Sequence, residues 1–226
     1  MKILKEGEEG FGGLIEYDSG YIPQELNKSM LKESTNQLQI DGDSIFIKCI
    51  LQKADALNRN GRVYPRAILE REINKYMALV KANSAISEID HPDTLNISLS
   101  NIPHRVVDMW WEGDTVYGKL EIFLTRGYVD MGICSAPGDK IAELLRRGVK
   151  IGISSRGLGS VKMVRGKNMV QDDFELVCFD LVASPSTPNA YLFQESMYVK
   201  ESVEIKGEKP TKNNKLKEKL NNFLTN

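Results

Sequence analysis

The strongest constraint on the fold is an apolar stretch, FELVCFDLV at positions 174–182, that contains Asp180 close to its end. Its β-branched and aromatic residues predict a strand, and successive side chains of a strand point to opposite faces. One predicted face consists of Phe174, Leu176, Cys178, Asp180 and Val182. An unpaired buried carboxylate is strongly unfavourable. Asp180 is therefore expected to have an interior partner, in a structural salt bridge or in a site, unless the strand turns it out to solvent.

The chain divides into three parts by composition. Its 226 residues suffice for one domain of ordinary size with tails. Residues 1–43 are glycine-rich and polar without a sustained period, and residues 199–226 are lysine-rich with one weak amphipathic helix. The folded domain is expected at residues 44–198.

Within that domain, strand and helix patterns alternate along the chain. SIFIKCILQ from Ser44 predicts a buried strand, and HRVVDMWWEGDTVYGKLEIFL at 104–124 predicts a β-hairpin. Apolar residues at helical spacing predict helices at 65–82 and 137–148. The expected fold class is mixed α/β (α+β).

Charge and cysteine content exclude several classes of partner. Thirty basic residues balance thirty-one acidic ones, so the net charge of -1 predicts no general attraction to nucleic acid or anionic lipid. Three cysteines without a C-x-x-C pair predict neither a disulfide framework nor a zinc site, and indicate a reducing compartment. The sequence has no apolar run long enough for a membrane span, so we expect a cytoplasmic protein with no membrane partner.

Two adjacent serines occur in KIGISSRGLGS, at 150–160. Alternation in VKIGIS predicts a strand that presents the Ser154 hydroxyl where the chain enters a glycine turn. Most clusters of Ser, Gly and Arg are ordinary loops. A serine acts as a nucleophile only beside a base, and the base needs a third group to orient it.

Only two histidines can supply that base. His91 lies in a polar loop segment, DHPD, whereas His104 begins a predicted strand and is expected to be structural. Ser154, His91 and Asp180 would together supply nucleophile, base and orienting acid. Two alternatives remain open. Cys134 is a rival nucleophile in a loop, and a weaker interpretation is a metal site formed by Asp90, His91, Asp93 and His104.

Six blocks occur in an order that resembles a known family. They are NRNGRVYPRAILE, SEIDHPD, VVDMWWEGDTVYGK, PGDKIAELLRRG, GISSRGLGS and DLVASPSTPNAYL, and they cover about residues 45–193. Together they resemble the prohead core protein proteases of T-even-type tailed bacteriophages. That family is similar to the herpesvirus maturation proteases, which have a β-barrel core surrounded by helices. The resemblance implies such a barrel here.

The resemblance also implies roles for individual residues. His91 would be the general base, Ser154 the nucleophile and Asp180 the third member, where the herpesvirus enzymes carry a second histidine. Ser155 is the alternative nucleophile or a supporting residue. The backbone N–H groups of Arg156 and Gly157 would face the developing oxyanion.

The implied biology is capsid maturation without a metal or other cofactor. A protease of this kind would be packed inside the prohead in the host cytoplasm, self-associate, activate itself, and cleave scaffolding core and capsid proteins after an apolar-x-Glu motif. LKE occurs at 31–33 and again at 216–218, so both tails are candidates for removal. The alternative from another class is a protease-like scaffold or shell protein that lacks catalysis.

Overall fold

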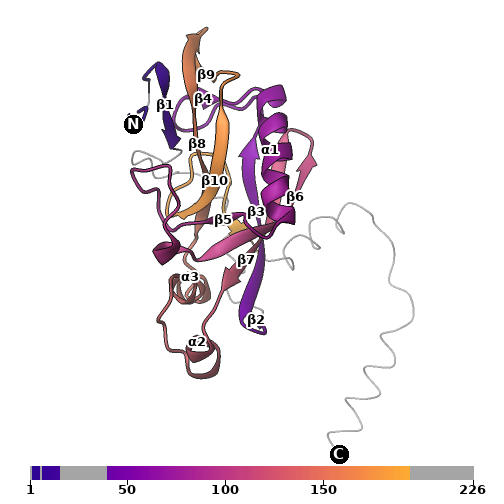
Figure 1. Ribbon diagram of the computed structural model, residues 1–226, viewed down its shortest axis with the longest axis vertical. Coiled ribbons are helices and arrows are strands. Elements are labelled where there is room, and N and C mark those ends of the chain that lie inside the picture. The colour runs from indigo at the N-terminus through magenta and orange to yellow at the C-terminus, as the bar shows by residue number, and fades with distance from the viewer. Residues whose placement is uncertain (1, 6, 16–39, 194–226) are drawn as a thin grey trace, which may run out of the picture. The chain divides into compact units, whose positions relative to one another are not determined.

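The computed structural model describes residues 2–5, 7–15 and 40–193, whose strands pair into two sheets (Figure 1). One sheet has five strands, which are β1 (Gly10–Ile15), β8 (Gly152–Val164), β9 (Lys167–Val170), β4 (Arg62–Val63) and β10 (Glu175–Val182). The other has six, which are β11 (Leu192–Phe193), β3 (Ser44–Lys53), β7 (Thr115–Phe123), β6 (His104–Glu112), β5 (Ile86–Ser87) and β2 (Ile40–Asp41). All the pairings between these strands are antiparallel except that of β4 with β9.

Among the described residues the helices are few and lie between strands in the sequence. They are α1 (Arg66–Lys81), the short 3-10 helix η2 (Leu99–Asn101), α2 (Arg126–Met131) and α3 (Pro137–Arg146). Both helices expected from the apolar spacing are present, and α1 starts directly after Pro65. Asp139 stabilises the start of α3, because its carboxylate accepts hydrogen bonds from the backbone amides of Thr125, Ser135 and Ala136.

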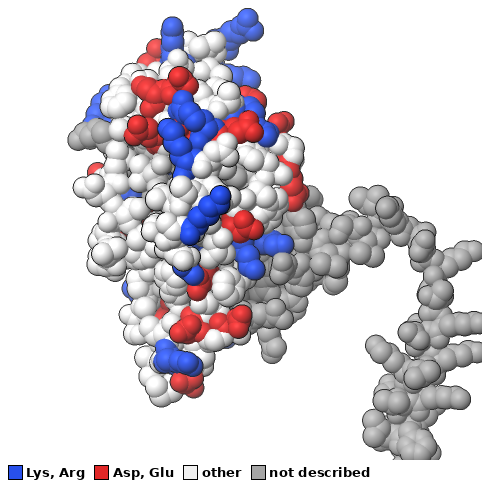
Figure 2. Space-filling model, turned by 45° about the vertical axis from the view of Figure 1, so that its right-hand side comes forward, with Lys and Arg blue, Asp and Glu red and all other residues white. Residues whose placement is uncertain are grey.

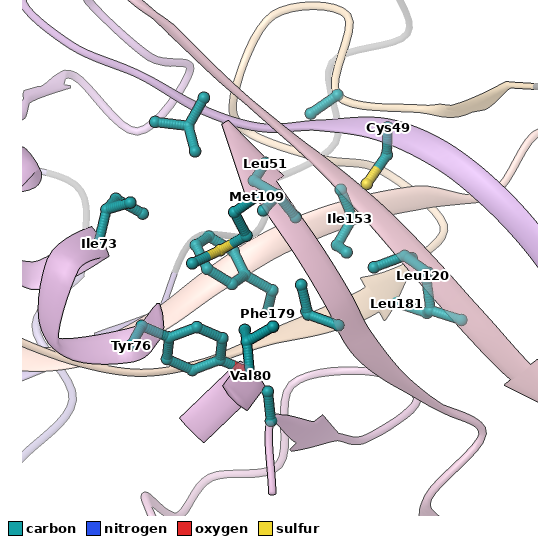
Figure 3. Packing of buried hydrophobic residues seen from close by; sticks show 14 of the residues in the cluster. Cys49, Leu51, Ile73, Tyr76, Val80, Met109, Leu120, Ile153, Phe179 and Leu181 are labelled. Carbon is teal, nitrogen blue, oxygen red and sulfur yellow. The ribbon is translucent and has the colours of Figure 1, made fainter. Parts of the chain in front are cut away.

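The core fills the space between the two sheets and under α1. Figure 3 shows Tyr76 and Val80 of α1 close to Phe179 of β10, with Ile153 of β8 and Leu120 of β7 nearby. The rings of Tyr76 and Phe179 meet edge to face at a centroid distance of 5.4 Å. Alternate residues of β8 and β10 therefore point into this core, and the others point to the opposite face.

The expected mixed α/β class is confirmed, but the described strands form two sheets and not the single closed barrel that the resemblance implied. Within the described residues, strand pairing gives two sheets, and no ladder closes them into one ring. The sheets meet through packed side chains, for example where β3 approaches β8, and through isolated backbone bridges such as that of Ile89 with Leu181. Packing between two twisted sheets can enclose a core without such a closing ladder.

The packed domain begins earlier than residue 44. β1 pairs with β8 from Gly10 opposite Val161 to Ile15 opposite Arg156. Leu4, Leu14 and Ile15 are buried, and the buried guanidinium of Arg62 donates hydrogen bonds to the carbonyl oxygens of Leu4 and Ile15. A six-residue strand beside glycines shows too little alternation to be recognised, so composition alone assigned it to a polar segment. Residues 16–39 and 194–226 lie outside the described part, as do both LKE tripeptides and the expected tail helix.

The predicted glycine turn after Ser154 is wrong, because β8 continues through it to Val164. Gly157 and Gly159 serve close packing instead. A Cβ atom on Gly157 would lie 2.4 Å from Cε2 of Phe174, and one on Gly159 would lie 2.8 Å from Cα of Phe174. The strand turns only at Arg165 and Gly166, where both residues have positive φ.

The surface has no obvious segregation of charge on the face seen in Figure 2, where acidic and basic side chains lie side by side. This fits the near-neutral balance of the sequence. Across the described ranges, no helix is long and apolar enough to cross a bilayer.

Candidate active site

The two adjacent serines point to opposite faces of β8. Ile153 lies in the core between the sheets, and Ser155 shares its face because the two are separated by one residue (Figure 3). Ser154 and Arg156 lie on the other face. Ser154 stands directly opposite Asp180 of β10 in the antiparallel register. Opposite residues on one face have Cβ atoms about 5 Å apart, so Ser154 and Asp180 are neighbours.

Ser155 belongs to a separate polar cluster between the sheets. Its Oγ accepts a hydrogen bond of 3.0 Å from Nε2 of Gln52 on β3. Oε1 of Gln52 in turn accepts a bond from the hydroxyl of Thr187. All three residues are buried, so this cluster links β3, β8 and the chain after β10 in the interior.

Asp180 is fully buried and has interior partners, as its place on an apolar strand required. Its Oδ2 lies 2.8 Å from Nδ1 of His91, and its Oδ1 accepts a bond of 3.0 Å from the backbone amide of Glu88. Burial by itself would raise the pKa of Asp180. The hydrogen bond and charge of His91, together with Arg156 and the Glu88 amide, hold that pKa below its ordinary value. Asp180 is thus an ionised acceptor at neutral pH.

His91 reaches Asp180 because the preceding residues pair with the outer edge of β10. Ile89 forms a parallel bridge with Leu181, whose N–H donates to the carbonyl of Glu88 and whose carbonyl accepts from the amide of Asp90. Asp90 has φ of 59°, so the chain turns there and places the imidazole beside the carboxylate. When Nδ1–H donates to Asp180, Nε2 is left unprotonated and can accept a proton.

Arg156 completes the charged network behind His91. Its side chain is buried, and its Nε lies 2.9 Å from Oδ2 of Asp180. Nη2 lies 2.8 Å from Oε2 of Glu88, and Nη1 donates a 2.7 Å bond to the carbonyl oxygen of Thr94. Burial opposes the charged form, but the nearby Cys178 and Asp180 raise the pKa of Arg156. The guanidinium therefore remains charged.

The sequence suggested a role for the backbone amide of Arg156 alone, and it gave no reason to single out Glu88. The sequence does contain a signal for the Arg156 side chain. Arg156 is two residues from Ser154 on a strand, so the two side chains lie on the same face. No local pattern identifies Glu88, which meets Arg156 only through the fold. The amides of Arg156 and Gly157 lie within β8, between β1 and β10, and successive N–H groups of a strand point to its opposite edges. The two amides therefore cannot converge on one oxyanion as the resemblance implied.

The other candidate residues occupy other places in the fold. His104 is buried at the start of β6, with Nε2 at 3.1 Å from the carbonyl oxygen of Phe179, and burial lowers its pKa to about 4. Cys134 is exposed in the loop between α2 and α3. In the described part of the chain, no group of three or more His, Cys, Asp or Glu side chains gathers as a metal site would require.

Comparisons with known proteins point to one family. A family model for the prohead core protein serine protease matches residues 17–204. The prohead core protein protease of Enterobacteria phage T4 is 35% identical over 163 residues, which is 71% of this chain and 73% of the relative. The solved structure of the bacteriophage T4 capsid assembly protease, gp21, matches with a TM-score of 0.59 and 28% identity, covering 79% of this chain and 100% of that one.

Proposed function

The chain belongs to the prohead core protein serine protease family, and from this premise we propose that Ser154, His91 and Asp180 are the catalytic residues of a phage maturation protease. The family establishes the serine protease activity, whereas the residue roles are inferred from the geometry. The observation that carries the proposal is the 2.8 Å contact between His91 Nδ1 and Asp180 Oδ2. Ser154 of β8 lies opposite Asp180 of β10, and both side chains are on the same face of this sheet.

The reaction follows from this arrangement. Nε2 of His91 takes the proton of the Ser154 hydroxyl while Oγ attacks the scissile carbonyl carbon, and Asp180 stabilises the imidazolium that forms. The imidazolium then gives its proton to the leaving amine, and an acyl-enzyme remains on Ser154. Water hydrolyses the acyl-enzyme with His91 again as base.

Two observations favour Ser154 over Ser155 as the nucleophile. Ser154 shares its strand face with Arg156, whose guanidinium contacts Asp180. Ser155 Oγ is bonded to Gln52 between the sheets instead. The pair therefore offers a matched control, because Ser→Ala at either position removes one hydroxyl from the same strand.

Labelling with a fluorophosphonate tests the assignment. We expect the wild type and Ser155→Ala to be labelled at Ser154, and Ser154→Ala to lose both label and peptide cleavage. Label on Ser155, or undiminished cleavage by Ser154→Ala, would overturn the proposal. Modification of Cys134 by a thiol reagent with loss of cleavage would support the cysteine alternative, and complete lack of label in folded protein would support a scaffold without catalysis.

The substrates that we propose are the scaffolding core and capsid proteins of the prohead, cut after an apolar-x-Glu motif. The family and its T4 relative support a role in the prohead, and the motif comes from the resemblance of the sequence. The enzyme would act inside the prohead in the host cytoplasm, where it would self-associate. Incubation with its scaffold protein, beside Ser154→Ala, tests this, and cuts at sites without a preceding Glu would contradict the motif.

Self-cleavage is the remaining part of the proposal. The LKE tripeptides at 31–33 and 216–218 are the predicted sites, and cleavage after each would separate residues 1–33 and 219–226 from the rest of the chain. Mass spectrometry of wild type and Ser154→Ala should show new ends after Glu33 and Glu218 in the wild type alone. Intact tails in a preparation that cleaves its scaffold would refute self-cleavage.

A further inference from the structure

The contacts of Arg156 fall on both sides of His91 in the sequence. Glu88, which precedes His91 by three residues, accepts a bond from Nη2, and the carbonyl of Thr94, which follows it by three, accepts a bond from Nη1. A third contact joins Nε to Asp180, the partner of the imidazole. One guanidinium thus holds both flanks of the His91 loop and the carboxylate beneath it.

Only an arginine can make these three contacts together. Its planar guanidinium presents donors in fixed directions from three nitrogens, whereas the lysine ammonium is a single point on a flexible stem. The side chain is wholly buried, so water cannot replace a contact that is lost. The residue also lies on β8 two positions after Ser154, so it fixes the loop relative to the strand of the nucleophile.

We propose that the Arg156 side chain is a positioning residue, which clamps Glu88, Thr94 and Asp180 so that His91 is held over Ser154. This inference rests on the proposed function, because it assumes that His91 and Ser154 act together. It assigns the side chain a role distinct from the oxyanion role that the sequence suggested for the backbone.

The clamp has an electrostatic consequence. Arg156 contacts two carboxylates, Glu88 and Asp180, so its single positive charge interacts with two negative charges. Without the Glu88 charge, Arg156 would act on Asp180 alone and would weaken the stabilisation of the imidazolium. In the described part of the chain, three further titratable groups interact with Asp180, and they are Cys178 of β10, Tyr76 of α1 and His104 of β6.

Those three groups are neutral near pH 7. Burial raises the pKa of the Cys178 thiol and of the Tyr76 phenol, and lowers the pKa of His104 to about 4. Arg156, Glu88 and Asp180 therefore dominate the local field that acts on the imidazole. Changing Glu88 alters that field without removing the arginine.

The first test replaces Arg156 with lysine, which keeps the positive charge and loses the fork. We expect Arg156→Lys to lower kcat about 100-fold, with KM changed less than about threefold, because a misplaced base impairs the chemical step more than substrate binding. The matched control is Arg62→Lys. Arg62 is another buried arginine, but its guanidinium bonds to the backbone carbonyls of Leu4 and Ile15, and its loss should leave kcat within about threefold of wild type. Equal kcat losses in the two variants, or none in Arg156→Lys, would overturn the proposal.

The second test uses Glu88→Gln and the pH dependence of kcat/KM. The acid limb of that profile reports protonation of the general base in the free enzyme. Removing the Glu88 charge should move the midpoint of the limb about half a pH unit lower, because the imidazolium becomes less stable. A purely structural contact predicts an unmoved midpoint. An unmoved or raised midpoint in a folded variant refutes the electrostatic part of the clamp.

Parallel measurements separate this inference from the function on which it rests. If Ser154→Ala keeps full cleavage, the proposed function fails. If Ser154→Ala is inactive while Arg156→Lys and Glu88→Gln match the wild type in kcat and in pH profile, only the clamp fails. Circular dichroism verifies folding, and should Arg156→Lys not fold, Glu88→Gln decides the outcome.

Discussion

His104 should make the stability of the protein fall between about pH 6.5 and about pH 4. Its imidazole is buried at the start of β6, with Nε2 beside the carbonyl oxygen of Phe179. Within the described residues, its Nδ1 has no hydrogen-bond partner. Burial therefore lowers its pKa from 6.5 to about 4, and the folded protein keeps this histidine neutral.

The sign follows from proton binding in the two states. As pH falls below about 6.5, the unfolded chain binds a proton at this histidine while the folded chain does not, so acid favours unfolding. The full stabilisation is present above the pKa of His104 in the unfolded chain, 6.5, and it is lost once the pH has fallen to its pKa in the folded protein, about 4. At about 1.4 kcal/mol per pH unit, the difference corresponds to about 3 kcal/mol of unfolding free energy.

Urea unfolding in steps from about pH 7.5 to about pH 4 measures this contribution. His104→Gln keeps a donor for Phe179 and should lose most of the decline. The matched control is His91→Gln, since the chain has only two histidines and this variant retains His104. Asp180 cannot cause the same slope, because its lowered pKa places its loss of stabilisation below this window. An unchanged decline in His104→Gln would refute the assignment.

Three further predictions concern the site and the strands that carry it. Asp180→Asn should lower kcat about 10⁴-fold in a peptide cleavage assay, because the amide cannot hold the required tautomer of His91, and activity within tenfold of wild type would contradict the triad. Gly157→Ala should lower the unfolding free energy by about 1–3 kcal/mol in urea titrations, because its Cβ would lie 2.4 Å from Cε2 of Phe174, and an unchanged midpoint would contradict this packing role. If cleavage follows Glu33, the N-terminal peptide should remain bound through β1 and co-elute in size-exclusion chromatography, whereas its separate elution would show that β1 is dispensable.

The sequence determined which carboxylate needed a partner. Alternation in FELVCFDLV placed Asp180 among apolar residues, and the cost of an isolated buried charge required an interior contact. Its proximity to His91 is observed, while the catalytic role stays a prediction. The mixed fold class and both longer helices were likewise predictable, because helical and strand periods are local properties that survive in a single sequence.

Only the tertiary structure decided how distant segments meet. His91 and Asp180 are 89 residues apart, and their contact depends on the pairing of Ile89 with Leu181. The same is true of Arg156, whose contacts with Glu88 and Thr94 connect a strand with a loop. No local period encodes such pairings, because they follow from the register between strands.

The glycines of β8 and the N-terminal strand show the same division. Gly157 and Gly159 suggested a turn because glycine is common in turns, but the chain needs them where Phe174 packs against a continuous strand. β1 lacked a visible period, and it forms because β8 offers an open edge and the buried Arg62 binds the carbonyl oxygen of Ile15 at the end of β1. The sequence thus determined what must be buried, and long-range strand pairing decided which groups share that interior.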